Sequence, residues 1–174
     1  MNSDPKVWAF WVAVASLLWN LCNTLYTRSV DSGNRQRSVR LEEFRSSVRQ
    51  PIDTLLSETQ DLEIKAENHA QTQVYTESDK TDLISLNKEI TALGRKLVKR
   101  LDDADRSQFS DGANWADRYF AKEDAILDAM NTATASDTSP ENRRIALIMV
   151  SKHLTALRRN IREALEDQVS ELAK

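Results

Sequence analysis

The chain has 174 residues and a net charge of −3, from 24 Lys and Arg against 27 Asp and Glu. Its three glycines and three prolines are too few for a β-sandwich, a β-barrel or an α/β fold with phosphate-binding loops, because these folds need frequent turns. A single cysteine excludes an internal disulfide framework and a cysteine-rich zinc site. The composition therefore predicts an all-α protein of one domain, with or without an appendage.

The first predicted element is an apolar helix over residues 7–27. These 21 residues lie between Lys6 and Arg28 and carry no charge. A helix of this length is about 30 Å long, enough to cross a bilayer core. Tryptophans near its start and Tyr26 at its end are typical of the headgroup layers. We expect a single transmembrane helix, with residues 1–6 as a short extracytoplasmic N-terminus.

Two other interpretations of this segment are weaker. A cleaved signal peptide would have a basic start and a small-x-small cleavage site, whereas residues 1–6 carry no net charge and no such site follows the apolar run. A buried core helix would rarely hold three tryptophans in 21 uncharged residues. A retained membrane anchor is the preferred interpretation.

Residues 28–50 form a basic juxtamembrane segment. Six arginines against three acids give +3 over residues 28–49, and residues 1–27 carry no net charge, so the total of −3 leaves −6 for residues 50–174. The positive-inside rule places the C-terminal part in the cytoplasm and the N-terminus outside. The small size, this charge pattern and the lack of lipidation signals favour a bacterial protein, and hence a span in the cytoplasmic (inner) membrane. The arginines either contact anionic lipid or only set the orientation. Those expected at the lipid surface are Arg28, Arg35, Arg37, Arg40 and Arg45.

Small and polar side chains recur along the span at alternating spacings of four and three. In membranes, small residues allow helices to approach closely and amides form hydrogen bonds between helices. The spacing predicts a packing face for self-association into a homo-oligomer. In the alternative, the asparagines reach toward the nearby interface and the spacing has no role. The face consists of Ala9, Ala13, Ser16, Asn20, Asn23 and Thr27.

After the span, the sequence predicts a break at 31–34, where Gly33 offers a flexible joint, and then a helix over 35–70. Pro51 lies inside this helix, so we expect a kink or a restart there. The expected core positions of this helix are Leu41, Phe44, Val48, Ile52, Leu55 and Leu62.

Three more helices are predicted over 80–105, 113–134 and 140–172. The helix over 80–105 is almost heptad-like, with Leu83, Leu86, Ile90, Leu93, Leu97 and Leu101. The helix over 113–134 has Trp115, Tyr119, Ile126 and Met130 on one stripe, widened by Phe120 and Leu127. The last has Ile145, Met149, Leu154, Leu157, Ile161, Leu165, Val169 and Leu172.

Turn and cap signals separate these helices. The segment 110–112 reads as a turn and cap cluster, and Ser139 followed by Pro140 is a typical helix start. Four helices with short turns predict an antiparallel cytoplasmic bundle over 35–174, whose C-terminus returns to the membrane-proximal end. An extended coiled coil between protomers is the alternative, but the aromatic residues favour a thicker core.

The sequence contains no recognisable catalytic constellation. His69 and His153 lack the glutamate three residues earlier that a di-metal bundle site uses, and no glycine-rich phosphate loop is present. The acids of 102–105 are expected to form a solvated helix end. No catalytic residue, metal or cofactor is therefore expected. Nucleic acid is not expected either, because acids follow closely after the six basic residues of 140–172 and residues 50–174 carry −6, so a solvated, partly salt-bridged helix explains the basic residues.

The predicted function is a protein–protein interaction or assembly module, anchored by one helix at the cytoplasmic membrane face. Its expected partners are membrane lipid, a second copy and a partner protein that the sequence does not identify. The alternative is a membrane-perturbing effector whose span forms an oligomeric pore gated by the bundle. A bundle enzyme ranks third, because the sequence supplies no catalytic group.

Overall fold

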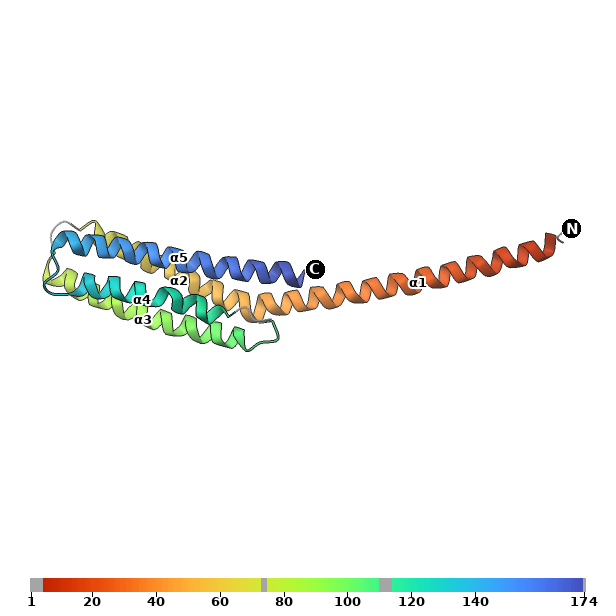
Figure 1. The fold of residues 1–174 in the computed structure, drawn as a ribbon, viewed down its shortest axis with the longest axis horizontal. Helices are drawn as coiled ribbons and strands as arrows, with labels where there is room; N and C mark the ends of the chain where they lie inside the picture. Colours follow the sequence, from red (N-terminus) through yellow and green to blue (C-terminus); the bar gives the residue numbers. More distant parts are fainter. Residues whose placement is uncertain (1–4, 73–74, 110–113, 174) are drawn as a thin grey trace.

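The computed structural model describes residues 5–72, 75–109 and 114–173, with the side chains of 5–13 outside that description. The described residues are almost entirely helical and contain no strand, so the predicted all-α class is confirmed. The elements are α1 (Pro5–Phe44), the π-helix η1 (Arg45–Arg49), α2 (Gln50–Ala70), α3 (Glu77–Asp105), α4 (Trp115–Thr134) and α5 (Pro140–Leu172). Because α1, η1 and α2 follow one another without a gap, they form one rod that projects far beyond the other helices (Figure 1).

Helices α2 to α5 form an antiparallel four-helix bundle. Each packs against the next in the chain, and α5 returns to pack against α2, so that the four close around one core. Figure 1 shows the C-terminal end of α5 beside the junction of α1 with α2, as four antiparallel helices require. The predicted helical bundle is confirmed, and its core is built within one chain.

Most of the predicted core is confirmed. The heptad-like positions of α3 are all buried, and so is the main stripe of α4, with Trp115 and Met130 fully inaccessible. Phe120 is wrong as a core residue, because its side chain is 48% exposed. It lies one position beyond Tyr119, and α4 turns that position away from its neighbours. The edge of Phe120 instead meets the Tyr119 ring at 5.8 Å between centroids.

The predicted core stripe of α5 is wrong at its start. Ile145 and Met149 are 49% and 39% exposed, whereas Ala146, Leu147 and Val150 are buried. Two apolar stripes run along this part of α5 a little apart, and the one that faces both α2 and α4 includes a small alanine. Close packing between helices selects that stripe, although the other contains larger side chains.

The predicted break at 31–34 is also wrong, because α1 continues through it as a helix. One glycine costs about 1 kcal/mol relative to alanine in a helix, and the good helix formers that follow can offset this. The hydroxyl of Ser32 donates to the carbonyl of Ser29 at 2.9 Å, within the same helix. A serine that bonds its own helix does not terminate it.

The irregularity expected at Pro51 occurs just before it. Pro51 has no N–H to donate and lies at the start of α2, and the preceding five residues form the π-helix. The N–H of Gln50 donates to the carbonyl of Arg45, the wider spacing of a π-turn. The rod therefore passes the proline without a break.

Two helix starts follow the local signals. Ser139 accepts a hydrogen bond from the N–H of Asn142 ahead of Pro140, as predicted. Thr76 and Asp79 form a reciprocal capping box at α3. The predicted cap cluster at 110–112 lies outside the described residues.

Candidate functional site

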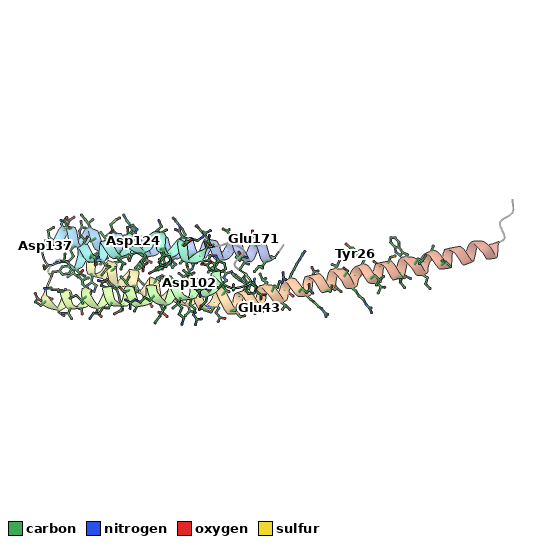
Figure 2. The ribbon with its side chains drawn as sticks, turned by 60° about the horizontal axis from the view of Figure 1, so that its bottom comes forward. Tyr26, Glu43, Asp102, Asp124, Asp137 and Glu171 are labelled. Carbon is green, nitrogen blue, oxygen red and sulfur yellow. The ribbon has the colours of Figure 1, made fainter. Side chains whose placement is uncertain are left out.

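The candidate functional site is the part of α1 that projects from the bundle. Phe44 is fully buried and Leu41 is half-buried, whereas the described side chains from 15 to 40 are exposed. At 1.5 Å per residue, the projecting part from Pro5 to Arg40 is about 54 Å long. Figure 2 shows Tyr26 on this projecting part, well away from the bundle.

The projecting helix exposes large apolar side chains. Such exposure is unusual in a protein surrounded by water, where contiguous apolar patches mark a contact site. The exposed residues are Leu17 (68%), Leu18 (56%), Trp19 (75%), Leu21 (55%), Leu25 (58%), Tyr26 (71%), Val30 (41%) and Val39 (64%).

Within the described part of the chain, no helix combines the length and the apolar character needed to span a membrane. The transmembrane helix predicted over 7–27 is therefore not supported by those residues. The side chains of 7–13, the first third of this segment, lie outside the description.

The described members of the predicted packing face lie on one side of α1. Ser16, Asn20, Asn23 and Thr27 follow spacings of four and three on an unbroken helix, which places them on neighbouring turns of one face, and all four are exposed. The Thr27 hydroxyl donates to the carbonyl of Asn23 at 2.8 Å, so it is already satisfied within the helix. Ala9 and Ala13 fall among the side chains that the structure does not describe.

The predicted lipid-contacting arginines are all exposed, but they do not form one patch. Arg28 and Arg35 are two turns apart on the same side of α1, while Arg37, Arg40 and Arg45 point to other sides, as 100° per residue requires. Arg28 and Arg45 are separated by about 25 Å along the axis. The basic segment therefore spreads its arginines around the helix and along its axis, and we call this set, Arg28, Arg35, Arg37, Arg40 and Arg45, the arginine ladder.

An aromatic cluster fixes α1 where it enters the bundle. The Phe44 ring meets Phe109 edge-on at 5.6 Å between centroids and lies 6.1 Å from Trp115. All three side chains are buried. Phe44 belongs to the projecting rod and its two partners to the α3–α4 corner, so the cluster joins the rod to the corner.

Charged pairs line the seam between α2 and α5. Arg158 and Glu63 approach to 3.0 Å with only 16% of each side chain exposed, although their alignment is too poor for a hydrogen bond. The same glutamate accepts a hydrogen bond from Thr155 at 2.6 Å. Arg162 lies 3.9 Å from Asp53, and Arg49 of η1 lies 4.0 Å from Glu166. These pairs bring opposite charges together along the seam.

The basic residues of α5 are largely engaged in such contacts. Arg144 pairs with Glu141 at 2.8 Å, which lowers the pKa of that carboxyl, and Arg159 pairs with Glu163 at 3.8 Å. Arg143 donates to the carbonyls of Ala133 and Ala135 and lies over the Tyr75 ring. Helix spacing alone could not reveal this role of Arg143, because its partners come from the end of α4 and from the α2–α3 connection.

A small cavity of about 20 Å³ lies between α2, α3, α4 and α5. Tyr119 lines it and donates to Glu123 at 3.3 Å, and burial followed by the nearby carboxylate raises the pKa of Tyr119. A space of this size holds one water molecule. It has no room for a substrate.

The histidines give no constellation. His69 and His153 are half-buried on α2 and α5. Among the described residues, no group of three or more His, Cys, Asp or Glu side chains could hold a metal ion.

Comparisons with protein-family models, with curated proteins and with solved structures find no match to this chain.

Proposed function

We propose that this chain is a non-enzymatic, single-pass membrane protein whose helical bundle is a protein–protein interaction or assembly module. In this proposal residues 7–27 cross the cytoplasmic (inner) membrane, the N-terminus is outside and the bundle lies in the cytoplasm. The single observation that carries the proposal is the projecting α1, whose large apolar side chains are exposed over 17–30. Leaving them in water is costly, so a lipid or protein environment should cover them.

Lipid is the favoured environment because of where the charges lie. Residues 7–27 carry no charge, and the first charged side chain after them, Arg28, opens the basic segment. The described residues do not by themselves form a membrane-crossing stretch. The proposal therefore depends on 7–27 as a whole, including the apolar residues at its start.

Self-association is part of the same proposal. An amide that faces hydrocarbon without a partner is costly, so Asn20 and Asn23 would favour contact with a second copy. Hydrogen bonds of this kind contribute about 0.6–2 kcal/mol each, enough to bias association. The bundle would then present its outer surfaces to a cytoplasmic partner.

Two lysine substitutions in the full-length protein test the anchor. Leu17→Lys places a charge at the centre of the proposed span, where insertion costs about 3 kcal/mol. Val39→Lys is the matched control, because Val39 is equally exposed on the same helix but lies outside the span. We expect Leu17→Lys to lower the fraction that floats with vesicles and Val39→Lys to leave it unchanged.

Equal flotation of the two variants and the unmodified chain would contradict the anchor. Dye release from the same vesicles separates an anchor from an oligomeric pore, which would leak.

A further inference from the structure

The helix between the proposed span and the bundle has no described contact with the rest of the molecule. From Arg28 to Arg40 every described side chain is exposed, and burial begins at Leu41. The backbone is helical throughout this interval, and the hydroxyls of Ser32 and Ser38 bond carbonyls of their own helix. From Thr27 to Leu41 the rod extends about 21 Å.

The rod is also fixed at its bundle end. Phe44 is enclosed by Phe109 and Trp115, and η1 continues the helix directly into α2. A tilt of α1 relative to the bundle would open this buried cluster. The bundle therefore keeps one orientation relative to the rod.

The last turns of α5, at the end of the bundle from which α1 projects, are acidic. Figure 2 shows Glu43 and Glu171 at this end and Asp137 at the opposite end. Residues 163–173 hold four acids and no basic residue, and neither α3 nor α5 has a basic residue in its last turn. The helix dipole favours basic residues at a helix C-terminus, so these acids do not stabilise the helix ends.

From these observations, and resting on the proposed function, we propose that residues 28–40 are a rigid spacer that holds the bundle about 20 Å from the membrane surface. Anionic lipid would attract the lower arginines of the ladder, Arg28, Arg35 and Arg37. It would repel the acidic last turns of α5 increasingly as the bundle leans toward the surface. The spacer and the two opposite charges together keep the bundle upright.

Energy transfer from a dye on the bundle to dye-labelled lipid measures its height. In a Cys22→Ala background, Asp103→Cys labels the near end and Asp137→Cys labels the far end, about 65 Å from the surface. The full-length protein is placed in vesicles of phosphatidylethanolamine and phosphatidylglycerol. We expect transfer from the near-end dye to exceed transfer from the far-end dye several-fold.

Two variants test rigidity and length separately. Seven extra helix-forming residues between Gln36 and Arg37 lengthen the rod by about 10 Å and nearly restore its rotation, so near-end transfer should at least halve. Replacing 30–36 with a glycine–serine segment of equal length should let the bundle lean and raise far-end transfer. Asp167→Lys with Glu171→Lys removes the repulsion from anionic lipid, so the double variant should raise far-end transfer in anionic vesicles and not in neutral ones.

Equal transfer from both ends of the unmodified chain would overturn the spacer, and so would a glycine–serine variant that behaves like the unmodified chain. Flotation of the same samples distinguishes the two failures. If the chain floats but both dyes transfer equally, only the spacer is wrong. If the chain does not float, the proposed anchor is wrong and the spacer is overturned with it.

Discussion

The carboxylate of Asp105 accepts a hydrogen bond from the backbone N–H of Trp115 at 2.8 Å, across the α3–α4 connection. Its second oxygen accepts from the N–H of Ala116 at 2.9 Å. The last residue of one helix thereby satisfies the first free donors of the next. Because Trp115 packs against Phe44, this contact also supports the aromatic cluster that holds α1 at the bundle.

Asp105→Asn should therefore destabilise the protein, since an amide offers one acceptor oxygen and no charge at a helix N-terminus. Loss of a helix cap costs about 1 kcal/mol, within a range of about 0.5–2. Urea unfolding followed by circular dichroism measures it. Asp103→Asn, an exposed neighbour in the same turn, is the control, and an equal effect of both substitutions would contradict the cap.

Gly94→Ala should destabilise the protein although alanine is the better helix former. An added Cβ at this position would collide with the Tyr119 hydroxyl, which Glu123 holds in a buried site. Overpacking of this kind costs about 1–3 kcal/mol. In a Tyr119→Phe background the hydroxyl is gone but the ring carbon Cζ would still lie 3.3 Å from the new Cβ, so Gly94→Ala should cost less stability than in the unmodified chain.

A double-mutant cycle from thermal unfolding gives the coupling between these two sites. A stabilising Gly94→Ala in the presence of Tyr119 would contradict the close approach of α3 and α4 at this site.

Arg143→Ala should cost more stability than Arg144→Ala. Arg143 satisfies two carbonyls at the end of α4 and lies over the Tyr75 ring at 4.6 Å, so its loss should cost about 1–3 kcal/mol. Arg144 makes an exposed pair with Glu141, worth about 0–1 kcal/mol. Chemical unfolding of the two neighbouring variants compares them directly, and the reverse order would exclude the proposed capping role.

Acid should weaken the contact between α2 and α3. The hydrogen bond from Lys65 to Glu89, at 2.6 Å, lowers the pKa of Glu89 below its ordinary value of 4.5. A lowered pKa in the folded state adds stability at pH values above the ordinary pKa. That stability is lost as the pH falls through the lowered pKa. Glu89→Gln should therefore show a smaller loss of Tm between pH 7 and 3. Glu58→Gln, at an exposed glutamate of α2, is the control, and matching losses in the two variants would contradict the pairing.

The sequence predicts the helices well because their limits depend on local chemistry. The helix predicted over 140–172 has those bounds in the structure, since a serine cap and a proline in the first turn define its start. The heptad of α3 is equally local. Four such helices with short turns leave little choice of topology.

Other features could not be read from local pattern. Gly33 looks like a break because neighbouring turn-forming residues resemble a loop, yet the helix tolerates all of them. The buried stripe of α5 depends on which face meets two other helices. The roles of Asp105 and Arg143 depend on partners eight or more residues away, brought close only by the fold.

The candidate site was predictable only in part. The apolar character of 7–27 and the charge that follows it are properties of the sequence, but their rigid connection to the bundle is not. That connection needs the unbroken helix through Gly33 and the buried seat of Phe44. The proposed spacer rests on these two structural facts and on the proposed anchor.

The accessibility of Cys22 shows whether α1 anchors the chain in a membrane. Cys22 is the only cysteine, it is exposed in the isolated chain and it lies within 7–27. Labelling membrane vesicles that contain the full-length protein with a water-soluble maleimide compares Cys22 with Ser38→Cys in a Cys22→Ala background. We predict that Cys22 stays unlabelled until denaturing detergent is added, while the cysteine at 38 reacts at once. Equally rapid labelling of both positions before detergent would contradict it.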